Sequence, residues 1–572
     1  MALRNKEIAQ KLTETADLLD IRDSNPHRIR SYRNAARVIA GMTEDLSEGT
    51  VRKSKLEEIP EVGSSIAGKI REIINTGELN QLKKLRKKVP SGLLQVMELE
   101  QMGPERTKSL YEELGVKSIE ELEEAAREGE VEQVSGFGKK TVENILEEIR
   151  AHENNPAKGR HLLADVEDEA EALKTFLEKE LNNVVVAGSY RRSKSTVGDI
   201  DTLATTKNAE KGMDHFTSYK RISRLLSKGE TRSSVVLNSG LQADLRIVKK
   251  RSHGAALLYF TGSKEHSIAL RKIGQEKKLK VNEYGIFKGK KSEAAKTEKE
   301  MYRKLGLKYI EPELRENRGE IEAARKNRLP ELVELEDIRG DLQTHTTASD
   351  GHHTLEDMVK AAADLGYEYY AVTDHSKRVT MANGLNENRL AKQIEEIDKL
   401  NKKQKNIRIL KSTEVDILKD GSLDLSDSIL KQLDVVVCSV HYNMKLSKKQ
   451  QTKRILRAME NPFFNILAHP TGRRIGVRDE MDLDMKEIMK EAKDKGCFLE
   501  INASPDRLDL EDHYIRMAKE TGLKLSISTD AHSTGQLDNM KYGIGQARRG
   551  WLEKDDVINT HSWKKLNKLL AR

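Results

Sequence analysis

The spacing of apolar residues changes along this 572-residue chain, and no single fold satisfies every pattern. Before about residue 183 the apolar positions follow helical spacing, as Ile8, Leu12, Ala16 and Leu19 show, without strand-like alternation. Short β-branched strands are then predicted at residues 183–188, 199–205, 234–237 and 243–248. The charged residues 297–335 that follow have the pattern of a long helix.

From residue 338 onward, short apolar segments alternate with amphipathic helices. Strands are predicted at residues 369–373, 435–440, 465–468, 497–501 and 525–528. Such alternation is typical of a parallel, barrel-like α/β domain. The sequence therefore predicts an all-α region, then an α+β region, then an α/β region. At roughly 150 residues per domain, the length fits three to five domains.

The composition excludes three classes of protein. Hydrophobic residues make up 37% and charged residues 34%, and no apolar run approaches the roughly 20 residues of a membrane span. The first residues lack the apolar core of a secretory signal, and Cys438 and Cys497 cannot form a disulfide framework. We therefore expect a folded cytoplasmic protein rather than a membrane, secreted or disordered one.

Positive charge is concentrated in one segment. The whole chain carries +8, from 101 Lys and Arg against 93 Asp and Glu, whereas residues 264–291 alone hold nine Lys or Arg against three Glu. This local excess favours a polyanionic partner, although a solvated helix face has the same composition. With 8 Phe, 14 Tyr and 2 Trp, the chain offers few platforms for stacked bases.

A short motif occurs three times in the first third of the chain, at residues 59–63 (IPEVG), 99–103 (LEQMG) and 134–138 (VSGFG). Each copy precedes a helical segment and resembles the helix-hairpin-helix element, whose glycine turn directs backbone N–H groups at a DNA phosphate. In the first two copies Glu61 and Gln101 replace the first glycine. One such turn would be an ordinary helix connection, but three predict binding to a nucleic-acid backbone. The DNA-binding positions would be Gly63, Gly103, Gly136 and Gly138.

Paired carboxylates mark the first candidate active site. Asp199 and Asp201 are two residues apart on a predicted strand, so their side chains point to the same face. Asp244, on a neighbouring strand, would complete an oxygen cage suited to Mg²⁺ or Mn²⁺. Two such ions activate a hydroxyl nucleophile and stabilise a departing pyrophosphate.

Donors for a triphosphate precede these carboxylates. The turn Gly188-Ser189 offers backbone and hydroxyl donors, and Arg192 offers a planar guanidinium. A Gly-Asp-x-Asp tetrapeptide alone fits an ordinary surface turn. The upstream Gly-Ser-x-Arg-Arg segment and the downstream Asp244 make a nucleotidyl-transfer site the preferred interpretation.

These motifs, together with residues 259–263 (YFTGS), resemble the family X DNA polymerases, in particular DNA polymerase beta, over residues 1 to about 318. The resemblance implies lyase-like, fingers, palm and thumb regions, with Asp199, Asp201 and Asp244 holding two catalytic metal ions. It implies nucleotide-binding roles for Gly188, Ser189, Arg192, Gly198, Tyr259, Phe260, Gly262, Ser267 and Arg271. Ser267 stands where the family usually has an asparagine at the nascent base pair, so the shorter hydroxyl puts fidelity in question.

The N-terminal region carries a candidate second activity. Lys69 matches the lysine that forms a Schiff base with an abasic sugar in polymerase beta, and Arg28 stands where that family recognises a 5′-phosphate. Such a lysine must be neutral to attack, so we expect burial or nearby cations to lower its pKa. Ser65 replaces a supporting lysine, and a plain phosphate contact by Lys69 is the alternative.

Metal-binding residue types recur at strand ends in the C-terminal region. They are His345, Asp350, His375, Glu414, His441, His469, Asp530 and His532. Loops at the C-terminal ends of strands in a βα barrel converge on one mouth, and imidazoles with carboxylates form a ligand set for Zn²⁺ or Mn²⁺. Isolated histidines are usually surface residues, but this succession predicts a metal centre.

Residues 337–572 resemble the PHP (polymerase and histidinol phosphatase) domain. The resemblance implies a distorted seven-stranded barrel, up to three metal ions and phosphoester hydrolysis. Behind a family X polymerase it implies Mn²⁺-assisted 3′→5′ exonuclease activity, sometimes with processing of abasic sites or 3′-phosphates. Gln343 departs from the family, which has histidine at both 343 and 345. A neutral amide oxygen is a weaker ligand than imidazole, so we expect one metal ion to bind less tightly.

The predicted domains are residues 1–80 (lyase-like), 81–160 (fingers), 161–255 (palm), 256–318 (thumb), 319–336 (linker) and 337–572 (PHP). We expect a repair polymerase that fills short gaps, in base excision repair or end joining, and trims 3′ ends. Its partners would be gapped or nicked DNA and deoxynucleoside triphosphates, with the protein acting as a monomer away from membranes. Two alternatives stay open: a phosphoesterase whose polymerase half only binds DNA, and a polymerase whose PHP domain is a non-catalytic scaffold because of Gln343.

Overall fold

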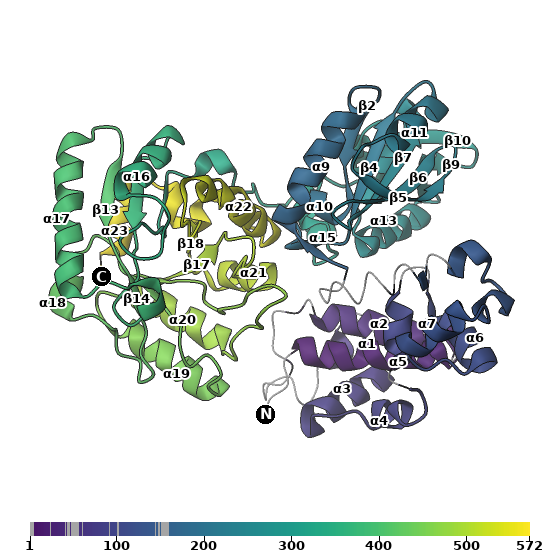
Figure 1. Cartoon of the computed structure of the whole chain (residues 1–572), viewed down its shortest axis with the longest axis horizontal. Coiled ribbons are helices and arrows are strands. Elements are labelled where there is room, and N and C mark those ends of the chain that lie inside the picture. The colour runs from purple at the N-terminus through teal and green to yellow at the C-terminus, as the bar shows by residue number, and fades with distance from the viewer. Residues whose placement is uncertain are drawn as a thin grey trace. The chain divides into compact units, whose positions relative to one another are not determined.

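The computed structural model describes residues 5–22, 25–40, 42, 46, 56–59, 61–90, 92–99, 102–142, 145–146, 149 and 159–571. It divides into two compact units, residues 1–158 and 159–572 (Figure 1). Gln101 of the second glycine motif lies outside the described residues. Among the helices described, none is both long enough and apolar enough to cross a bilayer.

The first unit is helical, as predicted. Its α-helices are α1 (Asn5–Ile21), α2 (Pro26–Ala40), α3 (Ser64–Thr76), α4 (Asn80–Arg86), α5 (Gly92–Glu98), α6 (Pro104–Leu114) and α7 (Ile119–Arg127). The residues whose spacing predicted the first helix, Ile8, Leu12, Ala16 and Leu19, are buried in a core that also contains α2 and α3 side chains. A second core gathers residues 96–149.

The second unit begins with a palm-like sheet in the order β2-β4-β7-β6-β5. Its strands are β2 (Asn182–Val186), β4 (Asp199–Thr205), β5 (Ile222–Lys228), β6 (Arg232–Leu237) and β7 (Gln242–Val248). Strands β4 and β7 run parallel and β2 is antiparallel to β4. Helices α9 (Leu163–Leu177) and α11 (Ala209–Thr217) pack on the sheet through an apolar core (Figure 1). A short pair, β1 (His161–Leu162) with β3 (Thr196–Val197), corrects the expectation of no strand before residue 183.

Thumb-like elements follow the palm. They are α12 (His253–Thr261), α13 (Lys264–Glu276), β8 (Lys280–Asn282), β9 (Gly285–Lys288), β10 (Lys291–Ala294), α14 (Glu298–Leu305) and α15 (Glu320–Arg325). The long helix expected over residues 297–335 is wrong, because the segment forms two short helices. Gly306 ends α14 in the left-handed conformation (φ 77°), and Pro312 lies in the turn between the helices.

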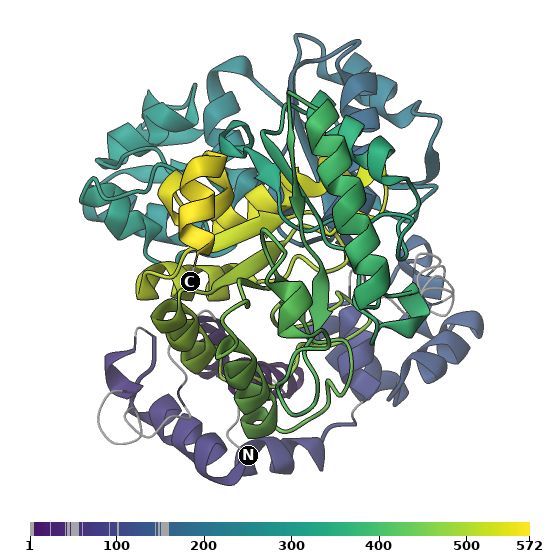
Figure 2. The same ribbon diagram turned by 90° about the vertical axis from the view of Figure 1, so that its left-hand side faces the viewer.

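The C-terminal region contains two parallel sheets, β11-β12-β13 and β14-β15-β16-β17-β18. The strands are β11 (Gly340–Asp341), β12 (Tyr369–Val372), β13 (Arg408–Lys411), β14 (Glu414–Asp416), β15 (Val437–Ser439), β16 (Ile466–Leu467), β17 (Phe498–Asn502) and β18 (Leu525–Ser528). Its helices are α16 (Leu355–Asp364), α17 (Glu387–Lys403), α18 (Asp427–Leu430), α19 (Lys448–Met459), α20 (Met485–Lys495), α21 (Asp512–Thr521), α22 (Met540–Arg549) and α23 (Trp563–Leu570). The helices lie on the outside of the strands (Figure 2).

The C-terminal region and the palm share a core. Leu508 and Tyr542 belong to the same apolar cluster as the palm strands, and Ile475 packs against that cluster. The Tyr542 hydroxyl also donates a hydrogen bond to Glu167 of α9. This packing makes residues 159–572 one compact unit.

Candidate active sites

The three palm carboxylates come from the two central parallel strands. Asp199 and Asp201 lie on β4, and Asp201 is the direct register partner of Asp244 on β7. Burial, together with Asp199 and Asp244, raises the pKa of Asp201 to about 7. Burial and Asp244 likewise raise the pKa of Asp199. A cation between these groups would relieve that repulsion, which is the electrostatic signature of a cation-binding carboxylate set.

Asp244 is also held by its own neighbours. Its two oxygens accept hydrogen bonds from Arg232 Nη2 (2.9 Å) and Gln242 Nε2 (3.0 Å). The sequence reasoning did not identify Arg232, because it reaches Asp244 from the adjacent strand β6. Close groups of at least three potential metal ligands occur, among the described residues, in the C-terminal region and not at this palm site.

Gly188 allows the Gly188-Ser189 turn to approach the carboxylates. A Cβ atom on Gly188 would lie 2.7 Å from Asp201 Oδ2, and the residue has a φ of +59°. Ser189 follows in the short helix α10 (Gly188–Arg191). Arg192 donates from Nε to Glu316 (3.0 Å) and from Nη1 to the Thr261 carbonyl. The structure therefore brings Gly188, Ser189 and Arg192 to the sheet edge that carries the aspartates.

The predicted nucleotide-lining residues lie at the start of the thumb. Tyr259 and Phe260 lie in the last turn of α12, and Gly262 caps that helix with a φ of +71°. The Arg246 guanidinium lies 4.4 Å above the Phe260 ring, which links the strand of Asp244 to this segment. Ser267 and the exposed Arg271 both lie on α13. Gly198 comes directly before Asp199.

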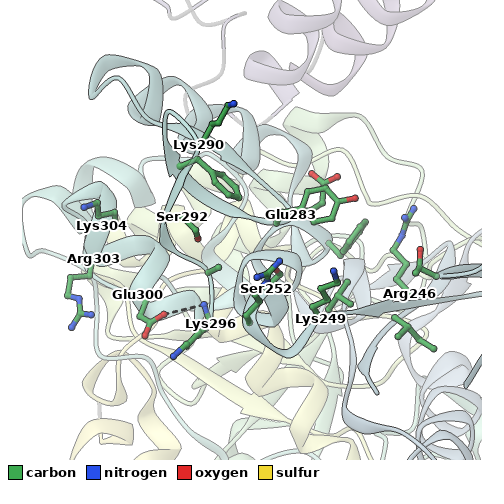
Figure 3. Close-up of a pocket in the computed structure, with 18 residues that line it drawn as sticks. Arg246, Lys249, Ser252, Glu283, Lys290, Ser292, Lys296, Glu300, Arg303 and Lys304 are labelled. Atoms are coloured by element: carbon green, nitrogen blue, oxygen red, sulfur yellow. Dashed lines mark hydrogen bonds between the residues drawn. The ribbon is translucent and has the colours of Figure 1, made fainter. Parts of the chain in front are cut away.

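A basic cavity opens between the end of β7 and the thumb strands (Figure 3), with a volume of about 1010 Å³. Its cationic lining residues are Arg246, Lys249, Arg251, Lys290, Lys296, Arg303 and Lys304. Glu283 and Glu300 are the acidic ones, and Phe260, Tyr284 and Phe287 are aromatic. Seven cations against two carboxylates make this cavity attractive to a polyanion.

In the N-terminal unit, Lys69 lies on α3. Burial and the nearby Arg28 guanidinium lower the pKa of the Lys69 ammonium, in the direction predicted. Gly63 and Gly103 are the N-cap residues of α3 and α6, and neither helix has a side-chain cap. Gly136 (φ +91°) and Gly138 precede a helical turn at residues 139–142, and a Cβ atom would meet nothing within 4 Å at either position. Their backbone N–H groups have the arrangement that binds anions at helix starts.

The C-terminal ligands form three overlapping groups, and within each group one ligand atom of every residue lies within 4.8 Å of the others. The groups are His345, Asp350, His375 and His532; His375, Glu414 and His441; and His345, Glu414 and Asp530. His469 joins them, with its Nε2 3.0 Å from Glu414 Oε1. All eight predicted residues other than Gln343 therefore come together at the strand ends. The sequence reasoning did not include Asp416, which lies two residues after Glu414 and whose Oδ1 is 3.3 Å from His441 Nδ1.

Several atoms of this cluster are buried without a hydrogen bond. They are His345 Nδ1, His375 Nδ1, His469 Nδ1 and Glu414 Oε2. His375 Nδ1 and Glu414 Oε2 are 3.0 Å apart, but the contact lacks hydrogen-bond geometry. Burial would lower the pKa of His375, yet Glu414 and Asp350 raise it well above its usual range. Buried ligand atoms without partners fit a metal centre, because such atoms are costly unless something binds them.

Gln343 is buried beside this cluster, with one atom of its side-chain amide 3.4 Å from Asp530 Oδ1. With its amide nitrogen toward Glu500, it donates to both Glu500 oxygens (2.5 and 3.1 Å). This orientation turns the Gln343 carbonyl oxygen toward Asp530 and the cluster. Glu500 is itself fully buried, and burial with Asp530 raises its pKa well above the usual range. The amide therefore satisfies a buried acid that sequence reasoning had not identified.

Comparison with known proteins agrees with this geometry. Residues 3–79 match a helix-hairpin-helix domain, 93–151 a SAM-like helix-hairpin-helix tandem, 256–316 the DNA polymerase beta thumb and 341–504 the PHP domain. Over 576 residues, covering 100% of both chains, the protein is 35% identical to the DNA polymerase/3′-5′ exonuclease PolX of Bacillus subtilis (strain 168). A probable phosphatase of Thermoanaerobacter sp. (strain X514) is 30% identical over 232 residues, 38% of this chain and 90% of that protein. The chain therefore belongs to the family X DNA polymerases of the PolX type, with helix-hairpin-helix elements, a polymerase beta-like thumb and a C-terminal PHP domain.

Proposed function

We propose that this chain extends a primer at the palm site, filling short gaps in damaged DNA, and trims 3′ ends at the PHP cluster. The observation that carries the polymerase assignment is the register pairing of Asp201 with Asp244, with Asp199 on the same strand face. Their mutual repulsion favours divalent cations, and Mg²⁺ or Mn²⁺ suits such oxygen ligands. These ions would supply activation of the primer hydroxyl and stabilisation of pyrophosphate when bound.

DNA is the proposed partner of both units. The helices that begin after Gly63 and Gly103 have no side-chain N-cap, and these helix N-termini support binding of the DNA backbone by the N-terminal unit. The basic cavity of Figure 3 supports a polynucleotide path along the thumb. Contacts of this kind read phosphate rather than sequence, which suits a repair enzyme acting at any gap, in base excision repair or end joining.

For the PHP cluster we propose 3′→5′ exonuclease activity, with abasic-site or 3′-phosphate processing as further phosphoester substrates. Its histidines and carboxylates would hold up to three ions, with Zn²⁺ or Mn²⁺ matching the mixed nitrogen and oxygen donors. Two bridges, Thr344 with Ala531 and His375 with Glu414, support the expected distorted barrel by linking the strand ends of the two sheets. The non-catalytic scaffold remains the second candidate, because Gln343 replaces a family histidine and its amide nitrogen is engaged by Glu500.

One assay tests both activities. A gapped duplex with a 5′-labelled primer is incubated with the full chain and Mn²⁺, first without and then with deoxynucleotides. We expect shortening and then growth of the primer. The double variant Asp199→Ala, Asp201→Ala should lose primer growth but keep primer shortening. His441→Ala should lose shortening but keep growth. Asp214→Ala, an exposed acid on α11, is the matched control. Growth that persists in the double aspartate variant would refute the palm assignment, and absence of shortening in the wild type would favour the scaffold.

We also propose a lyase function for Lys69. Its lowered pKa increases the neutral fraction that attacks the abasic sugar. Borohydride should trap the full chain on DNA with a 5′-deoxyribose phosphate, and Lys69→Ala should remove the adduct while Lys84→Ala, on α4, retains it. Equal trapping in both variants would leave Lys69 as a phosphate contact.

A further inference from the structure

A short turn of the PHP region, residues 474–478, follows the metal-cluster residue His469 and is called the arginine hairpin below. Arg474 and Arg478 exchange both backbone hydrogen bonds (2.8 Å each) as antiparallel partners. The hairpin also reaches the palm, because Ile475 packs against the apolar core of the palm sheet. One loop therefore extends from the metal cluster to the polymerase half of this unit.

The arginine hairpin holds two like charges on one face. Direct partners in an antiparallel pair point to the same side, and like charges placed in this way destabilise the pair. Asp506 binds the Arg474 guanidinium (2.7 Å), whereas Arg478 donates from Nε to the Gly472 carbonyl (2.9 Å). Across residues 159–571, the two Nη atoms of Arg478 have no acceptor. This edge of the guanidinium can therefore take an anion.

Arg507 extends the positive charge to the metal cluster. Its Nε lies 3.5 Å from Asp530 Oδ2, and its Nη1 is buried without a hydrogen-bond partner. Burial, together with the guanidinium groups of Arg507 and Arg474, lowers the pKa of Arg478, as expected where three like charges lie close together. Because Asp506 is paired with Arg474, the excess charge lies on Arg478 and Arg507, beside the cluster.

An exposed apolar side chain lies between the two arginines of the hairpin. Val477 is 76% exposed, and the neighbouring Gly476 turns the chain with a φ of +74° and open space around its Cβ position. A single exposed valine needs no partner, but cations and an apolar group together match a nucleotide strand. Such a strand offers phosphates to guanidinium groups and base surfaces to apolar side chains.

We propose that the arginine hairpin binds the primer strand on the 5′ side of the phosphodiester that the PHP cluster hydrolyses, with Arg478 on the adjacent phosphate and Val477 against a base. The inference rests on the proposed exonuclease function and deepens it. It assigns strand-binding residues, which a nuclease needs and a phosphatase acting on a single phosphate does not. The contact of Ile475 with the palm core supports the primer as the strand that is bound.

The first test measures how cleavage depends on strand length. The full chain with Mn²⁺ receives unlabelled single-stranded DNA of two or ten nucleotides, and release of the 3′ nucleotide is followed by chromatography. A dinucleotide has only the scissile phosphodiester, so it cannot reach the hairpin. We expect the wild type to cleave the ten-mer with a kcat/KM at least ten-fold higher, and Arg478→Gln to reduce this advantage about ten-fold.

Lys495→Gln is the control for this variant, because Lys495 is an exposed cation that pairs with Glu491 within α20. It should keep the wild-type length dependence. Arg507→Lys provides a contrast, since a residue at the scissile phosphate should lower the rates for the dinucleotide and the ten-mer alike.

The second test addresses the apolar contact with Val477→Ser. We expect KM for the ten-mer to rise about three-fold, with kcat within about two-fold and the dinucleotide rate at the wild-type value. Leu365→Ser is the matched control, because Leu365 is 47% exposed at the end of α16. The melting temperature of each variant should equal that of the wild type.

Two results separate the failures. If the wild type cleaves the ten-mer but Arg478→Gln and Val477→Ser keep its length dependence, the hairpin proposal is overturned and the exonuclease assignment stands. If the wild type cleaves neither strand, the proposed exonuclease function fails and the hairpin proposal fails with it.

Discussion

Arg191 of the palm and Glu298 of the thumb form a two-pronged ion pair, with Nη1 2.9 Å from Oε1 and Nη2 2.7 Å from Oε2. Arg315, which is fully buried, donates to the same Oε1 (2.5 Å). The pair joins the helix that begins at Gly188 to α14, so it fixes the thumb base beside the Gly188-Ser189 turn. Because two guanidinium groups, those of Arg191 and Arg315, bind the one carboxylate, Glu298 is the central acid of this junction.

Replacing Glu298 should destabilise the second unit strongly. Burial would raise the pKa of Glu298, but Arg191 and Arg315 lower it to about 2 from 4.5. A carboxyl with a lowered pKa stabilises the fold above pH 4.5 and loses that contribution as the pH falls toward 2. We expect Glu298→Gln to lower the free energy of unfolding by about 3 kcal/mol at pH 7, with a smaller difference from wild type below pH 4.5.

Denaturant unfolding at pH 7 and at pH 3.5 measures this difference. Glu322→Gln is the control, because Glu322 is exposed on α15 and pairs with Lys326, the residue that caps the end of that helix. A Glu298→Gln penalty that is constant over both pH values would show that packing, rather than charge, is lost.

Gly188→Ala should impair polymerisation by displacing Asp201. The added Cβ would lie 2.7 Å from Asp201 Oδ2, so the carboxylate has to move. A displacement of about 1 Å at reacting groups costs roughly a hundred-fold in rate. We expect that loss in kcat/KM for gap filling, with exonuclease activity unchanged.

Gly240→Ala separates crowding from backbone strain. Gly240 has a φ of +83° but open space around its Cβ position. Both variants carry the left-handed penalty of about 1–2 kcal/mol, whereas only Gly188→Ala meets Asp201. Equal polymerase activity in the two variants would remove the steric explanation.

Gln343→His tests the altered ligand position. An imidazole at 343 should add a nitrogen ligand to the cluster, and we expect tighter Mn²⁺ binding with exonuclease activity raised about ten-fold. Metal content after dialysis against a chelator, measured by mass spectrometry, reports binding independently of activity. Loss of the Gln343 amide also removes one donor from Glu500, whose Oε2 still accepts from the His469 N–H (2.8 Å) and Asn502 Nδ2 (3.1 Å), so Gln343→Ala is the control for that effect. If Gln343→His gains neither metal content nor exonuclease activity, the glutamine oxygen already acts as the metal ligand at this position.

Arg507 should assist hydrolysis at the PHP cluster. Its Nε lies 3.5 Å from Asp530 Oδ2, and its Nη1 is buried without a hydrogen-bond partner. A guanidinium in this position can bind a substrate phosphate in a planar fork, which an ammonium cannot reproduce. We expect Arg507→Lys to lower exonuclease kcat/KM about ten-fold while gap filling continues.

Arg516→Lys, on the surface of α21 where Arg516 pairs with Glu520, should change neither rate. Metal content must also stay at the wild-type value in Arg507→Lys. A fall in metal content would place Arg507 in support of Asp530 rather than at the substrate.

Local chemistry determined much of this protein from sequence alone. Period-two alternation put Asp199 and Asp201 on one face of β4, whose bounds at residues 199–205 were predicted correctly. The strands before His441 and Asp530 were likewise identified, because apolar β-branched runs ending in polar residues are local signals. Strand β5 was not predicted, since its exposed, charged alternation lacks an apolar face.

Only the tertiary structure decided which distant groups meet. The bridge from Arg192 through Glu316 to Arg549 joins residues that are more than 100 positions apart, and no local pattern marks them. The pairing of Gln343 with Glu500 is a second example. The sequence shows that a glutamine stands where the family has a histidine, but it does not show which buried carboxylate accepts a hydrogen bond from that glutamine. Backbone periodicity is set by neighbours in sequence, whereas buried charges must find partners anywhere in the fold, and that requirement is met only when the chain is packed.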